Sequence, residues 1–349
     1  MAFDINNFIK TNKRIFIWTA FFGLLYLVRD MFSLVFMTFI LCFIFHNLIE
    51  RLTARTPLPR RLWTIIVYLV FLAVFTALVS IVGPKLGFES TAFLKQVPQT
   101  LEKIQNFLIN LAQQQPQLGP VIERLRDALS LERFAGVQGT TIVTIVVKVV
   151  NQVTQYSSHF LLSVLFSFLI LFDFPNLKAR TMALRESKLG EVYDETAHSV
   201  VQFALTIGAA FQAQAMIACL NTLLTAIGLW GLGIKQIALL SSIVFIFGLI
   251  PVLGVFLSSA PILLLAFNAG GFHLTLGALV MIIIVHIIEA YILNPRIFSA
   301  VFKINPVLTL IILYIGHSFF GVWGMILGMP VSVYIFRQVI QGQSLRKKD

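Results

Sequence analysis

Apolar runs long enough to cross a lipid bilayer recur along this chain, and they constrain its fold more than any other feature. Residues 62–82, for example, contain no charged side chain. About 20 consecutive apolar residues are enough to span the hydrocarbon core of a membrane. Charged residues make up only 12% of the 349 residues, about half of their share in soluble proteins. The sequence therefore predicts an all-α polytopic membrane protein.

The positive charge of the chain fits the same interpretation. The formal net charge is +11, and much of it lies next to the apolar runs, where the positive-inside bias places Lys and Arg in the cytoplasm. The bias puts both chain ends in the cytoplasm; the residues that carry it are Lys10, Lys13, Arg14, Arg51, Arg55, Arg60, Arg61, Arg337, Arg346, Lys347 and Lys348. No basic patch alternates with aromatic residues, so we expect no nucleic-acid partner.

The alternation of apolar and polar stretches predicts six parts and about eight membrane segments. They are residues 1–83 with the first three spans, 84–140 as an extracytoplasmic helical insert, 141–173 as the fourth span, 174–200 as a cytoplasmic connector helix, 201–340 as a C-terminal transport unit, and 341–349 as a basic cytoplasmic tail.

The insert has an amphipathic pattern. Apolar residues recur at helical spacing; they are Phe93, Val97, Leu101, Ile104, Leu108 and Leu111. Such a stripe predicts a helix with one apolar face. Two interpretations stay open, a helical hairpin packed on the membrane part or a helix lying on the lipid surface. The nearly balanced charge of the insert favours the first, because surface helices are usually rich in Lys and Arg.

The span at residues 201–230 is unusually rich in amide side chains, among them Gln212, Gln214 and Asn221. Amides in hydrocarbon need hydrogen-bond partners from neighbouring helices or from water. They either hold helices together or line a polar pathway. We expect the second and include these three residues among the candidate pathway residues.

Two apolar stretches of the transport unit are interrupted in their middle. The stretch 237–267 contains "FGLIPVLG" with Pro251 and Gly254, and the stretch 307–336 contains "FGVWGMILG" with Gly324. Each half falls short of the length that crosses a bilayer, and irregular backbone at membrane depth is tolerated where it lines a cavity. We therefore expect two broken or re-entrant hairpins at a binding site. Two thin full spans at 237–267 remain the alternative.

A carboxylate and an imidazole are close in the sequence between these stretches. Glu289 and His286 are three residues apart and share one helix face. A carboxylate inside a membrane is costly, so it is a candidate proton carrier; a snorkelling or capping pair is the alternative. His317 is a further candidate. No Walker A, HExxH or GxSxG motif occurs, so we expect neither an enzyme nor a cofactor. The two cysteines lack metal-ligand spacing, and we expect no metal.

The C-terminal residues resemble a known family. "GLIPVLGVFLSSAP" and the stretch from "HIIEAYILNP" to "GMPVSVYIF" are similar to the autoinducer-2 exporter family of bacterial permeases. The resemblance implies pathway residues at Gln212 or Gln214, Glu289, Asn294 and Pro330. Val252 and Val255 stand where relatives carry an aromatic residue and a second proline, which puts the substrate in doubt.

The resemblance also implies a function and partners. Members are homo-oligomers of the bacterial inner membrane, with five-fold symmetry as our expectation. Some export autoinducer-2, a quorum-sensing signal, and others exchange sodium or lithium for protons. We therefore expect a secondary transporter that exports a small polar solute, with proton coupling through Glu289. The alternatives are a sodium/lithium-proton antiporter and, in another class, a passive channel or a membrane scaffold for a partner protein.

Overall fold

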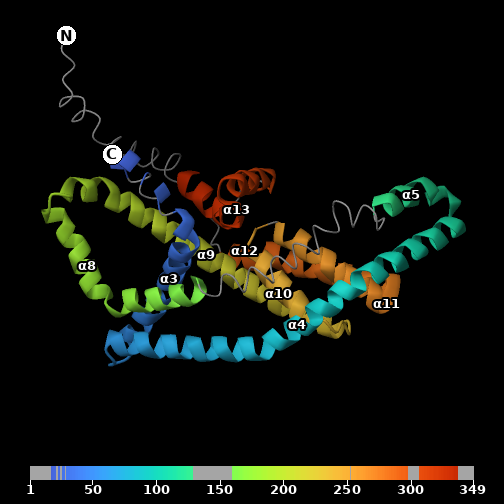
Figure 1. Cartoon of the computed structure of the whole chain (residues 1–349), viewed down its shortest axis with the longest axis horizontal. Helices are drawn as coiled ribbons and strands as arrows, with labels where there is room; N and C mark the ends of the chain where they lie inside the picture. Colours follow the sequence, from blue (N-terminus) through green and yellow to red (C-terminus); the bar gives the residue numbers. More distant parts are fainter. Residues whose placement is uncertain are drawn as a thin grey trace, which may run out of the picture. The chain divides into compact units, whose positions relative to one another are not determined.

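The computed structural model describes residues 17–20, 23, 26–27, 29–128, 159–251, 253–297 and 306–336. Within these ranges the chain is helical and contains no strand (Figure 1). The principal helices are α3 (Phe32–Arg55), α4 (Arg60–Gln114), α5 (Gly119–Ala128), α8 (Phe174–Ala183), α9 (Gly190–Gly231), α10 (Ile237–Gly248), α11 (Leu253–Ile288), α12 (Asn294–Ile297) and α13 (Pro306–Phe336). The prediction of an all-α protein is confirmed.

Several expected segments lie outside the described residues. They are the N-terminal residues 1–16, the end of the insert and the start of the fourth span at 129–158, Val252, residues 298–305, and the basic tail with Arg337 at 337–349.

The described chain divides into two compact units. The first unit takes the described residues within 1–73, 156–212 and 330–349, and the second takes those within 74–155 and 213–329.

The first unit has an aromatic core between α3, the start of α4 and the helix His159–Phe172. The ring of Phe45 makes edge contacts with Tyr68 and with Phe71, at centroid distances of 4.9 and 5.1 Å. Tyr68 makes a similar contact with Phe168 at 5.3 Å. Edge-to-face ring pairs stabilise a core beyond the area that they bury, so these contacts fix the three helices against one another.

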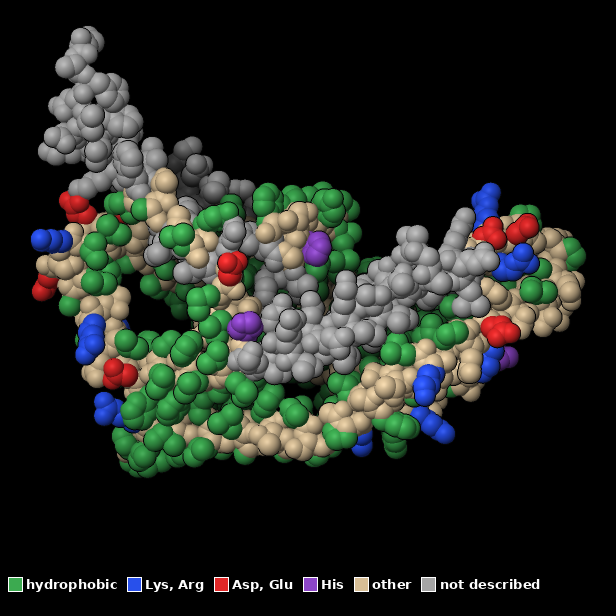
Figure 2. Space-filling model, in the orientation of Figure 1, with side chains coloured by type: hydrophobic (Ala, Val, Ile, Leu, Met, Phe, Trp, Pro, Cys, Tyr) green, Lys and Arg blue, Asp and Glu red, His purple; other side chains and the backbone are tan. Residues whose placement is uncertain are grey.

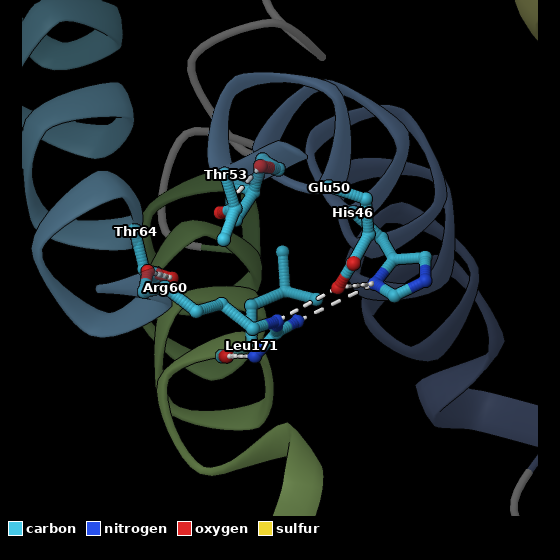
Figure 3. Close-up of polar contacts among 7 residues, drawn as sticks. His46, Glu50, Thr53, Arg60, Thr64 and Leu171 are labelled. Carbon is cyan, nitrogen blue, oxygen red and sulfur yellow. Dashed lines mark hydrogen bonds and ion pairs between the residues drawn. The ribbon is translucent and has the colours of Figure 1, made fainter. Parts of the chain in front are cut away.

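An arginine joins the ends of these helices (Figure 3). Arg60 donates from Nε to Glu50 Oε1 at 2.9 Å and from Nη1 to the carbonyl oxygen of Leu171 at 2.6 Å. Its guanidinium also lies 5.0 Å from the centre of the Phe174 ring. The chain bends by 73° between His159–Phe172 and Phe174–Glu186. Arg60 therefore binds on both sides of this bend.

Replacing Arg60 with methionine should destabilise the first unit by about 2 kcal/mol, because hydrogen bonds to charged groups contribute about 1.5–3 kcal/mol. Thermal unfolding in detergent measures the effect. Arg55→Met, at an exposed position at the end of α3, is the matched control and should change stability little. Equal stability of the two variants would show that the Arg60 contacts do not stabilise the unit.

The second unit contains two helical breaks of the kind expected from the sequence. The first lies between α10 and α11, around Pro251. The second lies inside α13, where Gly321 has a φ of +58°. Glycine adopts this left-handed region without the steric cost that a side chain would bring.

A third break reverses the chain inside α11. Gly270 and Gly271 leave the helical conformation, with φ of −147° and +62°. Residues 254–262 and 282–289 on either side of it line one pocket, so the two segments of α11 lie side by side.

The two halves of α13 form a hairpin around Gly321. A side-chain carbon on Gly324 would collide with the backbone carbonyl of Gly316, and a carbon on Gly328 would lie 3.1 Å from Ile312 Cγ2. The pairs Gly316–Gly324 and Ile312–Gly328 lie symmetrically about residue 320 in the sequence. This symmetry is expected for two antiparallel helices joined by a turn near that residue. The bend itself falls at Gly321, whereas Gly324 lies at the closest approach.

The amphipathic stripe of the insert belongs to one long helix. α4 continues from Arg60 to Gln114 and contains Pro84 and Pro98. Phe93, Val97 and Leu101 are buried in a core with residues of α10 and α11. This part of the stripe therefore packs on α10 and α11 of the same unit.

The surface is apolar where the candidate spans lie. α3, α4 and α9 are long and apolar enough to cross a membrane, and the stretch Leu253–Leu293, which turns back at Gly270–Gly271, is equally apolar. Hydrophobic side chains cover the exposed start of α4, whereas charged side chains gather on α5 and on the adjoining part of α4 (Figure 2). Hydrocarbon can solvate the first surface but not the second. The protein is a multi-pass membrane protein.

Candidate pathway site around Glu289

A pocket in the second unit contains the carboxylate of Glu289. Helix α9, the tip of the α10–α11 hairpin and both segments of α11 line it. Its polar lining residues are Asn221, Thr225, Ser258, Ser259, His286 and Glu289. The cavity has a volume of about 40 Å³, which is room for about three waters. We call it the Glu289 pocket.

Glu289 begins a π-helical turn that runs to Leu293. The backbone N–H of Asn294 donates to the carbonyl oxygen of Glu289, five residues earlier. Pro295 has no N–H for the carbonyl four residues before it, so the regular ladder cannot continue here. Wider turns of this kind occur frequently at functional sites.

The carboxylate of Glu289 is held by an amide. Asn221 Nδ2 donates to Glu289 Oε2 at 2.6 Å, and the Glu289 side chain is 14% exposed. A carboxylate only accepts hydrogen bonds when ionised, so the amide must present its nitrogen to it. Asn221 Oδ1 is therefore turned away, and it is buried with no hydrogen-bond partner in the described part of the chain.

His286 is a weaker neighbour of Glu289. Its Nδ1 lies 3.8 Å from Glu289 Oε2, and its side chain is 53% exposed. This separation exceeds the usual hydrogen-bond length. The two residues share a helix face, as predicted, but Asn221 makes the shorter contact to the carboxylate.

Hydroxyl groups complete the polar lining. Ser258 donates to the carbonyl oxygen of Gly254 at 2.8 Å, and Ser259 donates to that of Val255. Each hydroxyl thus uses its hydrogen within its own helix and keeps lone pairs that can accept. Oxygen acceptors around one carboxylate form a lining that suits a proton or a small hard cation.

The broken backbone at the hairpin tip is held in place by a second amide. Gln214 Nε2 donates to the carbonyl oxygen of Gly248 at 2.7 Å. A side-chain carbon on Gly254 would collide with the carbonyl of Phe247, so only glycine permits this close return of the chain. Gly248 and Gly254 both line the pocket.

The structure brings some of the expected pathway residues together. Asn221, Gly254, His286 and Glu289 line one pocket, and Gln214 contacts its wall through Gly248. Pro251 lies in the turn at the hairpin tip and is partly buried, without lining the pocket.

Other expected residues lie elsewhere. Asn294 ends the π-helical turn, Gly324 lies at the crossing of the second hairpin, and His317 is exposed on the first helix of that hairpin. Gln212 is exposed and Pro330 is buried, and both belong to the first unit. Among the described residues, no group of three His, Cys, Asp or Glu side chains could hold a metal.

Sequence reasoning did not single out Ser258 and Ser259 as site residues. The sequence could have identified them, because the two serines follow the hairpin tip within "FLSSAP". Two adjacent hydroxyls in an otherwise apolar stretch at membrane depth need partners, as the amides do.

Membrane-spanning apolar helices, broken hairpins and a carboxylate within the pocket are features typical of transport proteins. Residues 15–342 match the family described as AI-2E family transporter. The chain belongs to this family, and the resemblance seen in the sequence is confirmed.

Several relatives are similar along most of their length. "Putative transport protein YdbI" of Bacillus subtilis (strain 168) is 29% identical over 329 residues, which cover 93% of this chain and 90% of that protein. YueF of the same organism carries the same description and is 25% identical, over 89% of this chain and 84% of that protein. The "Sodium-lithium/proton antiporter" of Halobacillus andaensis is 22% identical over 84% of each chain.

Proposed function

We propose that the protein is a secondary transporter that exchanges protons for a small monovalent cation at the Glu289 pocket. The observation that carries the proposal is the pairing of the Glu289 carboxylate with Asn221 inside a small cavity that hydroxyl side chains help to line. A cavity for about three waters suits a dehydrated cation better than an organic solute. The name of the Halobacillus andaensis relative points to the same chemistry.

The carboxylate makes the exchange obligatory. Glu289 in the membrane is costly as a bare anion, and it becomes neutral either by taking a proton or by pairing with a monovalent cation. Asn221 Nδ2 stabilises the ionised form, and the serine hydroxyls offer further oxygen ligands. Only the two neutral states are inexpensive to move, so one proton exchanges for one cation.

Export of a small polar solute is a second candidate. The hydroxyls of Thr225, Ser258 and Ser259 with the amide of Asn221 would bind a hydroxylated solute such as autoinducer-2, for which the family is named. The size of the pocket in this conformation favours the cation.

We also propose the setting in which the transporter works. It would lie in the bacterial inner membrane as a homo-oligomer with both chain ends in the cytoplasm. The arginines at 51, 55, 60 and 61 support this orientation, because positive charge next to spans stays in the cytoplasm. The hairpins at 237–267 and 307–336 would be re-entrant. α10 supports this, because its 12 residues extend only about 18 Å.

Proteoliposomes with an entrapped pH dye test the exchange. An imposed sodium or lithium gradient should drive protons in the opposite direction, with a rate that saturates as the cation concentration rises. A channel would give a rate that does not saturate, and a scaffold would give no flux. Either result would contradict the proposal, and proton movement driven only by a hydroxylated solute would favour the second candidate.

Asn221 allows a sharper test of the cation ligands. Asn221→Leu removes the donor that holds the Glu289 carboxylate, so the apparent cation affinity should fall by about tenfold or more, as expected for loss of a buried polar partner. Asn221→Ser keeps a small polar group and should lower the apparent cation affinity less than Asn221→Leu does. The cation dependence of dye quenching measures both, and equal affinity in Asn221→Leu would remove Asn221 from the site.

A further inference from the structure

Three polar side chains on α4 lie at intervals of seven residues. They are Glu89, Gln96 and Lys103, and because seven residues make nearly two helical turns they share one face. Between Glu89 and Lys103 this face extends about 21 Å along the helix. The pocket does not include any of the three.

These side chains bind both ends of the α10–α11 hairpin. Glu89 Oε2 accepts a hydrogen bond from the backbone N–H of Leu239 at 2.7 Å, in the first turn of α10. Lys103 Nζ donates to Asn268 Oδ1 at 2.8 Å, near the end of the first segment of α11. A carboxylate at a helix N-terminus also interacts favourably with the helix dipole.

Gln96 connects the two ends to each other. Its Oε1 accepts from Asn268 Nδ2 at 3.1 Å and from Gln236 Nε2 at 3.4 Å. Gln236 immediately precedes α10. One amide oxygen thus binds the beginning and the end of the hairpin, opposite its tip at Pro251.

Apolar contacts reinforce the polar ones. Phe93, Val97 and Leu101 share a buried core with Leu239, Leu240, Leu265 and Ala266 of the hairpin. The ring of Phe107 lies 5.8 Å from that of Phe267 and 5.5 Å from that of Phe272. These two residues flank the turn at Gly270–Gly271, so α4 also contacts the point where α11 reverses.

We propose that the segment Glu89–Phe107 of α4 is a brace that holds the open end of the hairpin and thereby sets the position of its tip in the Glu289 pocket. Glu89, Gln96 and Lys103 are positioning residues. α10 is only about 18 Å long and is rigid, so a shift at its start moves Gly248 and Ile250 in the pocket wall. The effect on transport rests on the proposed function.

The test combines transport with a readout that needs no transport. The brace variant is the double change Gln96→Leu and Lys103→Met, and the matched control is Lys95→Met, an exposed lysine on the same helix. For transport both are made in the wild-type chain, and for labelling both are made in a protein with Cys42 and Cys219 replaced by serine and with Ser259→Cys in the pocket. The rate of thiol labelling at residue 259 reports the position of the hairpin.

The brace variant should change the labelling rate and weaken the apparent cation affinity by about fivefold or more, as for a typical coupling between sites, with little change in maximal rate. Lys95→Met should match the parent in both. Gln96→Leu with Lys103→Arg, which restores the charged donor, should recover part of the affinity.

Unchanged labelling together with unchanged affinity in the brace variant would overturn the proposal. A lower maximal rate with unchanged affinity and labelling would also overturn it, since that pattern indicates only less folded protein. If the wild-type protein transports no cation, the proposed function fails, and the labelling rate alone still decides whether the brace exists.

Discussion

Replacing Glu289 with glutamine is expected to abolish proton-coupled cation flux while the protein stays folded. Glutamine has nearly the same shape as glutamate, and its oxygen can still accept the hydrogen bond that Asn221 Nδ2 donates at 2.6 Å in the wild type. It neither takes up a proton at working pH nor carries a negative charge. The variant pocket is therefore permanently neutral and no longer attracts a cation electrostatically.

Proteoliposomes measure the loss, with thermal unfolding in detergent as the check on folding. Dye quenching driven by a sodium or lithium gradient should fall to the level of empty vesicles. Glu289→Asp keeps the charge on a shorter side chain and should retain a reduced flux. Wild-type coupling in Glu289→Gln would show that another group carries the proton.

His286 provides the matched control for this prediction. It lies on the same helix face, 3.8 Å from the carboxylate, but 53% of its side chain is exposed. His286→Gln should therefore change the flux by only a few-fold, because interactions between exposed charges are weak. If His286→Gln lost flux as completely as Glu289→Gln, the two residues would have to act as one proton-carrying pair.

The sequence predicts the elements of this site better than it predicts their pairing. Hydropathy locates the spans, and prolines and glycines locate the breaks, because both signals are local. The contact of Asn221 with Glu289 joins residues 68 positions apart, and no local pattern encodes it. His286 was the expected partner because helix periodicity shows only neighbours on the same helix.

The long-range contacts of α4 show the same limit. Its apolar stripe predicted a packed helix, and Phe93, Val97 and Leu101 are buried. The seven-residue spacing of Glu89, Gln96 and Lys103 is visible in the sequence, but polar residues at helical spacing usually form a solvated face. Only the positions of Leu239 and Asn268 reveal that these side chains have partners.

The similarity between "FGLIPVLG" and "FGVWGMILG" has a steric counterpart in the structure. In the first break, a carbon added to Gly254 would meet the carbonyl of Phe247, and in the second a carbon added to Gly324 would meet the carbonyl of Gly316. Both hairpins thus return so closely that backbone packs on backbone. The two breaks use glycine for the same purpose, close approach rather than flexibility.

Replacing Gly324 with alanine should therefore destabilise the second hairpin severely. The new carbon would collide with the carbonyl oxygen and carbon of Gly316, and these are backbone atoms that cannot rotate away as the end of a side chain can. The two halves of α13 would have to separate around this crossing. We expect a loss of about 3 kcal/mol or more, at the upper end of the cost of overpacking.

Gly87→Ala is the matched control, because it makes the same chemical change inside α4. No atom lies within 4 Å of the position that its new carbon would take, so alanine should stabilise the helix by about 0.5–1 kcal/mol. Unfolding temperatures in detergent should therefore shift in opposite directions for the two variants. If Gly324→Ala unfolds at the wild-type temperature, the halves of α13 do not pack through Gly316 and Gly324.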